Sequence, residues 1–193
     1  MSYEKIEEIF MRIIAGKAKG HLLQAPKGMH TRPTTDRVKE AIFSTLGGIV
    51  QNAVVLDAYA GSGALGLEAL SRGAKQGIFL EKDRNAIQCI RQNLEHTKLA
   101  KQAVVWQGLA EKLLTQLQGK YHFDLVFLDP PYQTGQIALL EPLLLLPGML
   151  AEDVVVVLET TNKNQELFTN VVWHQYKTAS YGDTAVVYYG LKK

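Results

Sequence analysis

The sequence contains very little cysteine, since Cys89 is the only one in 193 residues. A single thiol excludes an internal disulfide and a zinc site built from several thiolates, and it is typical of a reducing cytoplasm. The neighbours of Cys89 in "RNAIQCIRQNL" predict a buried helix residue rather than a reactive thiol. Four histidines also lack metal-ligand spacing, so we expect no metal site. These histidines are His30, His96, His122 and His174.

Long apolar runs are absent as well. No run approaches the ~20 residues of a membrane span, because Pro142, Pro147 and Asp153 interrupt the longest candidates. The first ten residues are acidic and lack the order of a signal peptide. We therefore expect a cytoplasmic protein with no membrane contact, built as one main domain with residues 1–10 as an N-terminal extension.

Basic residues are concentrated near the N-terminus. From Arg12 to Lys39 there are seven bases and one acid, Asp36, which gives this stretch a charge of +6 and the remaining residues −4. This distribution predicts an anionic partner bound at one end, although a solvated face without a partner would look the same. We accordingly expect a basic arm with a β-hairpin at residues 11–33 and a main domain at residues 34–193.

Short apolar runs alternate with amphipathic stretches from residue 54 onward. The runs are β-branched and continuous, as strands buried on both faces of a parallel sheet are, and the stretches between them have helical spacing. This order predicts an α/β fold with a doubly wound, mostly parallel sheet. The predicted strands are 54–59, 77–82, 103–107, 123–129 and 154–160, and the predicted helices are 63–73, 83–99, 109–119 and 136–146.

Both ends of the chain depart from this alternation. Two strand-like runs, 170–177 and 184–193, leave no room for a helix between them, which predicts a C-terminal antiparallel hairpin. At the other end, residues 11–26 predict a small β-hairpin. Residues 34–48 predict a helix that Thr34 or Thr35 caps and Gly47 ends. Seven strands with a terminal antiparallel hairpin are typical of the Rossmann-like class I methyltransferase fold.

The segment "LDAYAGSGALG" (56–66) joins the first predicted strand to the first helix and matches G-x-G-x-x-G, a pattern of dinucleotide-binding turns. Glu81, at the end of the next strand, can accept hydrogen bonds from a ribose diol, which nicotinamide dinucleotides and S-adenosylmethionine both contain. Asp57 separates these alternatives, because a carboxylate repels a pyrophosphate but attracts a sulfonium and an ammonium group. The loop therefore predicts S-adenosylmethionine as the cofactor.

A second motif, "LDPPY" (128–132), ends the fourth predicted strand and borders the same crevice. The exocyclic amine of a nucleobase is a poor nucleophile, because its lone pair is delocalised into the ring. Asp129 and the carbonyl of Pro130 can accept its two N–H bonds and orient the lone pair, while Pro131 stiffens the turn. Tyr132 offers a flat face on which an extruded base can stack. We therefore expect metal-free methyl transfer that depends on proximity and alignment.

Five segments resemble, in order and spacing, the bacterial RsmD family: "MRIIAGKAKG", "RPTTDRVKEAIF", "LDAYAGSGALGLEALSRGA", "EKDRNAI" and "FDLVFLDPPY". Members of that family methylate the exocyclic 2-amino group of one guanine in 16S rRNA. The resemblance runs from Met11 nearly to the C-terminus. "DPPY" is shared with adenine-N6 and cytosine-N4 methyltransferases, whereas "RPTTDRVKEAIF" is specific to the family.

The resemblance, with the charge pattern, gives each motif an expected role. Asp129 to Tyr132 are expected to hold the guanine amine, and residues 34–193 to form the S-adenosylmethionine-binding domain. The expected partner is 16S rRNA, within a small-subunit assembly intermediate and bound by a monomer. The expected cofactor contacts are Thr34, Asp57, Ala60, Gly61, Ser62, Gly63, Glu81, Lys82, Leu109 and Ala110. The expected RNA contacts are Arg12, Lys17, Lys19, Arg32, Arg37 and Tyr181.

Two features depart from the family pattern. His21 stands where family members carry arginine, which weakens one expected phosphate contact. "WQGLAEKLL" has no acid at the tip of the third strand, where many methyltransferases place one near the adenine. The adenine contact is therefore expected through the backbone of Leu109 or Ala110.

Other functions remain open from the sequence. A DNA adenine or cytosine amino-methyltransferase generally has a separate target-recognition region, and no stretch here is left to form one. A protein-glutamine methyltransferase usually has Asn where this chain has Asp129. A non-catalytic RNA-binding assembly factor would not bind S-adenosylmethionine, and a nicotinamide-dependent oxidoreductase would bind NADH.

Overall fold

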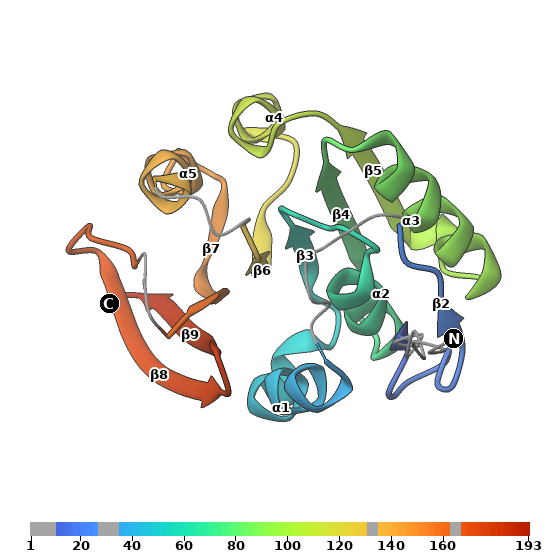
Figure 1. Ribbon diagram of the computed structural model, residues 1–193. Coiled ribbons are helices and arrows are strands. Elements are labelled where there is room, and N and C mark those ends of the chain that lie inside the picture. Colours follow the sequence, from blue (N-terminus) through green and yellow to red (C-terminus); the bar gives the residue numbers. More distant parts are fainter. Residues whose placement is uncertain (1–10, 27–34, 131–134, 163–166) are drawn as a thin grey trace, which may run out of the picture.

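The computed structural model describes residues 11–26, 35–130, 135–162 and 167–193. Strands and helices alternate through most of the chain (Figure 1). The N-terminal elements are β1 (Met11–Arg12), β2 (Leu22–Leu23), α1 (Asp36–Leu46) and the 3-10 helix η1 (Gly47–Val50). Next come β3 (Val54–Asp57), α2 (Ala64–Ser71), β4 (Gln76–Glu81), α3 (Arg84–His96), the 3-10 helix η2 (Ala100–Gln102), β5 (Ala103–Gln107) and α4 (Ala110–Leu117). The last elements are β6 (Phe123–Leu128), α5 (Gln136–Leu144), β7 (Leu150–Thr161), β8 (Trp173–Tyr181) and β9 (Thr184–Leu191).

Seven strands form one sheet in the order β5-β4-β3-β6-β7-β9-β8. The first five strands in this order are parallel to one another, whereas β9 is antiparallel to both β7 and β8. Helices α1, α2 and α3 cover one face of the sheet, and α4 and α5 cover the other (Figure 1). The predicted seven-stranded, mostly parallel sheet and its C-terminal hairpin are therefore confirmed, as is the short β1–β2 hairpin.

Local sequence explains where the first helices begin and end. Asp83 caps α3, because its Oδ1 accepts a hydrogen bond from the amide of Ala86 at 2.9 Å. At the start of α1, Thr35 Oγ1 accepts a longer bond from the amide of Val38, at 3.4 Å. Gly47 ends α1 with a φ of +52°, a conformation that favours glycine. Of the two predicted caps of α1, Thr35 is confirmed, and Thr34 lies outside the described residues.

The predicted start of β7 and the predicted burial of Cys89 were wrong. β7 begins at Leu150 rather than at residue 154, because Phe123 pairs with Leu150 before an irregularity shifts the register between β6 and β7. Cys89 is half-buried rather than buried. It lies beside the buried face of α3, and that burial raises the pKa of its thiol, with Asp83 adding to the shift.

The C-terminal hairpin also differs from its prediction. β8 continues beyond residue 177 to Tyr181, which pairs with Thr184 at the start of β9. Only Gly182 and Asp183 remain between the strands, so the turn is much tighter than the predicted six-residue connection. Gly182 has a φ of +62°, as a two-residue hairpin loop requires. Tyr181 is therefore a strand residue at the base of the turn.

The β1–β2 hairpin packs against α2 through buried polar contacts. The carboxylate of Glu68 is fully buried and accepts hydrogen bonds from the amides of Ile14, at 2.7 Å, and Ala15, at 3.0 Å. Gly16 passes so close to α2 that a Cβ on it would lie 1.9 Å from the carbonyl oxygen of Ser71. The apolar residues of this region join the core that α1, α2 and α3 share with the sheet. They are Met11, Ile13, Ala18 and Leu23.

Candidate active site

The parallel strands β3, β4, β6 and β7 end along one side of the sheet, here called the carboxyl rim. The glycine loop lies on this rim between β3 and α2. Gly61 and Gly63 have φ angles of +54° and +81°, and Gly63 is the N-cap residue of α2. Gly66 lies inside α2, where a Cβ would meet the ring of Phe79 at 2.3 Å. The first two glycines thus set the turn, and the third allows α2 to pack closely on the sheet.

Asp57, the last residue of β3, lies beneath this loop and is 4% exposed. Its Oδ2 accepts a hydrogen bond from the amide of Gly66, in the first turn of α2, at 3.0 Å. Burial raises the pKa of Asp57 to about 7, Glu81 adds to the rise, and the Gly66 hydrogen bond opposes it. The carboxyl group therefore supports the start of α2 and places an acid directly under the glycine loop.

Glu81, at the end of β4, connects the glycine loop to the next strand. Its Oε2 accepts a hydrogen bond from the amide of Gly61 at 2.9 Å, and its Oε1 accepts two, from the amides of Lys82 and Asp83, at 2.7 and 2.9 Å. Its backbone oxygen accepts the amide of Gly108 at 2.9 Å. Glu81 thus fixes the loop and the turn before α4 relative to each other, and Oε2 keeps capacity for a further donor.

The remaining predicted cofactor residues lie around this position. Ala60 and Ser62 are buried in the loop, where the backbone oxygen of Ser62 accepts a hydrogen bond from Asn93 at 3.0 Å. Lys82 is exposed beside Glu81. Leu109 is exposed and occupies the N-cap position of α4, and Ala110, the first residue of α4, is buried. Thr34 lies outside the described residues.

Asp129 and Pro130 follow β6 directly on the carboxyl rim. Asp129 is half-buried and Pro130 is buried. Burial raises the pKa of Asp129 well above its ordinary value, and the nearby carboxyls of Glu159 and Asp57 raise it further. Pro131 and Tyr132 lie outside the described residues.

Strand register places a third acid, Glu159, next to Asp129. Leu128 pairs with Leu158, so the residues that follow them stand side by side at the ends of β6 and β7. Asp57 pairs with Phe127 and therefore lies two residues before the level of Asp129 along the strand direction. Each of the three acids comes two residues after a core residue on the face of the sheet that α1 and α2 cover. Because side chains alternate along a strand, all three acids lie on that same face. The sequence motifs missed Glu159, although an acid directly after the apolar run "VVVVL" was a usable signal.

The predicted RNA contacts divide between two ends of the molecule. Arg12 forms a salt bridge with Asp36 at the start of α1, with 2.9 Å between Nε and Oδ2, and exposed Arg37 follows. Half-buried Tyr181 lies level with the end of β7, because it and Thr161, the last residue of β7, both pair with Thr184. These positions lie toward the carboxyl rim. Arg32 lies outside the described residues.

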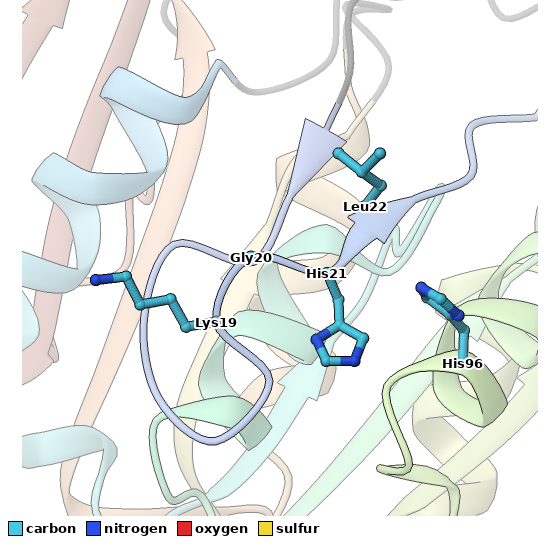
Figure 2. Close-up of a pocket in the computed structure, with 5 residues that line it drawn as sticks. All are labelled: Lys19, Gly20, His21, Leu22 and His96. Atoms are coloured by element: carbon cyan, nitrogen blue, oxygen red, sulfur yellow. The ribbon is translucent and has the colours of Figure 1, made fainter.

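Lys17 and Lys19 lie at the opposite end of the β1–β2 hairpin. Lys17 donates a hydrogen bond to Gln102, just before β5 begins, and so lies at the amino ends of the strands. Lys19 lines a surface pocket with Gly20, His21, Leu22 and His96 (Figure 2). His96 ends α3, whose 13 residues span about 20 Å at ~1.5 Å each. The pocket is therefore remote from Asp129, and the structure does not bring these lysines to the acids.

Two further findings concern what the described residues lack. No group of three or more histidine, cysteine or acidic residues in the described parts of the chain is arranged to hold a metal ion. Within the same ranges, no helix is both long and apolar enough to cross a membrane.

Comparison with known proteins adds a family. The family described as "Conserved hypothetical protein 95" matches residues 11–190. "Ribosomal RNA small subunit methyltransferase D" from Haemophilus influenzae is 38% identical over 89% of each chain. The protein of the same name from Escherichia coli K12 is 40% identical over 80% of this chain and 76% of its own. An Escherichia coli structure named "Putative methyltransferase yhhF" is 35% identical, with a TM-score of 0.83, and the match covers 95% of this chain and 98% of that one.

Proposed function

The chain belongs to the RsmD family, described as "Conserved hypothetical protein 95", and from this we propose that it transfers a methyl group from S-adenosylmethionine to the 2-amino group of a guanine in 16S rRNA. The observation that supports this best is the position of Asp129, half-buried on the carboxyl rim beside the glycine loop. Relatives with methyltransferase names support the reaction class, and those named for the small ribosomal subunit support an rRNA substrate.

The residues around the glycine loop fit S-adenosylmethionine better than a dinucleotide. Asp57 and Glu81 are acids under and beside the loop, so they favour a ligand with a sulfonium and an ammonium group over one with a pyrophosphate. Oε2 of Glu81 can accept a ribose hydroxyl, and the backbone of Gly61 to Gly63 allows close approach. When bound, S-adenosylmethionine supplies a methyl group on a good leaving group.

Asp129 and Pro130 act on the amine. The Asp129 carboxylate and the Pro130 carbonyl accept its two N–H bonds and turn the nitrogen lone pair toward the donor side of the rim. Methylation leaves an extra proton on that nitrogen. The raised pKa of Asp129 makes this carboxyl a better acceptor for the proton than an ordinary aspartate. Pro131 and Tyr132 extend the motif, and Tyr132 supplies a stacking face for the base.

The RNA approaches from the carboxyl rim. Exposed Arg12 and Arg37 contact its phosphates together with Arg32, which lies between them in the sequence, and Tyr181 borders the base. The protein acts as a cytoplasmic monomer on an assembly intermediate of the small subunit, where the target guanine is still accessible.

Transfer of labelled methyl groups tests this proposal. Purified protein with labelled S-adenosylmethionine should label small subunits that lack this modification, and Asp129→Ala should abolish labelling while calorimetry still detects cofactor binding. Glu152→Gln, an exposed acid on β7, is a matched control that should label normally. Binding of NADH instead of S-adenosylmethionine, or labelling of DNA alone, would refute the proposal.

A further inference from the structure

Asn93 joins two parts of the chain that the proposed function uses separately. It lies in α3 and is only 1% exposed. Its Oδ1 accepts a hydrogen bond from the amide of Gln24 at 2.8 Å, and its Nδ2 donates to the backbone oxygens of Gln24 and Ser62, each at 3.0 Å. Gln24 directly follows β2, where the chain runs beside α3 (Figure 1), and Ser62 lies inside the glycine loop. One buried side chain therefore fastens the β1–β2 hairpin and the loop to the same helix.

The side-chain amide of Asn93 uses both of its donor hydrogens at this junction. The amide of Gln24 needs an acceptor and the two backbone oxygens need donors, so only one orientation of the side chain fits. Aspartate has the same shape but, as a carboxylate, only accepts, so it would keep the bond from Gln24 and lose the other two. The junction therefore depends on an amide, and Asn93→Asp removes it with little change in side-chain volume.

Ser62 also contacts the first strand of the hairpin. Its Oγ lies 3.6 Å from Sδ of Met11, which pairs with Leu23 across the hairpin. Both Ser62 and Met11 are buried. The next residue, Arg12, is exposed and bonds to Asp36 at the start of α1. Arg12, one of the proposed RNA contacts, is thus one residue away from the contact between the hairpin and the glycine loop.

The proposed reaction places one substrate on each side of this junction. The hairpin carries Arg12, which contacts RNA, and the glycine loop holds S-adenosylmethionine. A shift of about 1 Å between reacting groups costs on the order of a hundredfold in rate. Taking the proposed function as given, we propose that Asn93 is a positioning residue, which holds the glycine loop at a fixed place relative to the RNA-binding hairpin. It acts through Ser62 and touches neither substrate.

Loss of the junction should lower the rate of transfer more than the binding of either substrate. Without Asn93, Glu81 still holds the amide of Gly61, and Arg12 remains exposed beside Asp36, so each side keeps its own binding contacts. Only their relative placement is released. The expected signature is therefore a fall in kcat with nearly unchanged affinities, which a loss of stability alone does not produce.

Asn93→Asp tests this signature in steady-state transfer to small subunits that lack the modification. Its kcat should fall by between about tenfold and a hundredfold, whereas KM for the small subunit should change by less than about threefold. Calorimetry with S-adenosylhomocysteine should likewise give a Kd within about threefold of the wild-type value. Thermal unfolding would establish that the variant is folded at the assay temperature.

Ser71→Ala is the matched control. Ser71 is buried and also joins the hairpin to a helix, since its Oγ accepts the amide of Ala18 at 2.9 Å and donates to the backbone oxygen of Ala15 at 2.6 Å. It is the last residue of α2, so it lies at the opposite end of that helix from the glycine loop. This variant should lose stability but keep its kcat within about twofold of wild type.

Three results with these variants would overturn the inference and leave the proposed function intact. They are an unchanged kcat in folded Asn93→Asp, an equal fall in kcat for Ser71→Ala, and a loss that is expressed only as weaker binding. If Asn93→Asp does not fold, Asn93→Ala replaces it, because water can enter the space and pair with the freed backbone groups. The same fall in kcat is expected, and an unchanged kcat would again overturn the inference.

A measurement on the wild-type protein needs no variant. S-adenosylhomocysteine, bound at the glycine loop, should slow hydrogen exchange of the Gln24 amide, because Asn93 links that amide to Ser62. Unchanged exchange of this amide at saturating S-adenosylhomocysteine would also overturn the inference. Absence of transfer by the wild-type protein to any guanine would instead overturn the proposed function.

Discussion

Gly66→Ala should destabilise the protein, although alanine is the better helix former. Gly66 lies in α2, where the added Cβ would be 2.3 Å from Cε1 and 2.7 Å from Cζ of Phe79. The ring is completely buried, so it has no open space into which to move. The same Cβ would lie 3.1 Å from Oδ2 of Asp57, which accepts the amide of Gly66. The substitution therefore strains the helix, the strand and the acid under the glycine loop together.

The expected size follows from two opposing effects. Glycine to alanine inside a helix gains about 1 kcal/mol. Overpacking of a close-packed core costs about 1–3 kcal/mol, and a Cβ more than 1 Å inside ordinary contact distance belongs at the upper end of that range. The net loss is about 2 kcal/mol, which lowers the Tm of a domain of this size by roughly 4–8 °C. Affinity for S-adenosylmethionine should fall as well, because Asp57 and the loop shift.

Thermal and urea unfolding measure this loss. Gly48→Ala is the matched control, because a Cβ at Gly48 would meet nothing within 4 Å, and its stability should stay unchanged or rise slightly. Phe79→Leu should make Gly66→Ala less harmful, so the two changes should cost less together than the sum of their separate effects. If Gly66→Ala is as stable as Gly48→Ala, the account of the third glycine is wrong.

Three further predictions concern other parts of the site and the arm. The pKa of Asp57 is about 7 in the folded protein, against an ordinary value of 3.8, so folding keeps a proton on Asp57 between these pH values and its contribution to stability falls as pH rises through that window. The free energy of unfolding of Asp57→Asn, relative to wild type, should therefore rise by roughly 1.4 kcal/mol per pH unit between pH 5 and 7 in urea titrations. A difference that does not change with pH would contradict this. Gly16→Ala should lower the Tm, because its Cβ would clash with α2 at a φ of +85°; unchanged thermal unfolding would show that the hairpin is not held as described. In rRNA-binding titrations, Arg37→Ala should weaken binding and reduce the slope of log affinity against log salt concentration by about one. Lys19→Ala, near the amino ends of the strands, should weaken binding less. Equal losses of affinity would show that RNA contacts both ends of the strands.

Much of the fold could be predicted because its determinants are local. β3, β4 and β6 are almost continuously buried, and such strands give unbroken apolar runs. Thr35 was one of the two caps that the sequence offered for α1, and Asp83 is a residue type that commonly caps helices. The two motifs could also be recognised from the sequence, since a glycine turn and Asp-Pro-Pro each need particular residue types at fixed spacing. Their placement on one rim then followed from the parallel sheet.

The rest depended on contacts between distant residues. Glu159 could be placed beside Asp129 only once the register of β6 and β7 was known. The hydrogen bonds from Ile14 and Ala15 to the buried Glu68 link positions more than fifty residues apart, so the path of the hairpin along α2 was not predictable. For the same reason, charge alone grouped the basic residues into one arm, whereas the fold places Arg12 and Arg37 toward the carboxyl rim and Lys17 and Lys19 near the amino ends of the strands.

The most direct test of the account is the identity of the methylated nucleoside. Small subunits that lack the modification would be incubated with labelled S-adenosylmethionine and either the wild-type protein or Asp129→Asn, and their rRNA digested for mass spectrometry. We expect N2-methylguanosine at a single position with the wild-type protein and none with Asp129→Asn. Label in N6-methyladenosine or N4-methylcytosine, or undiminished N2-methylguanosine with Asp129→Asn, would contradict the account.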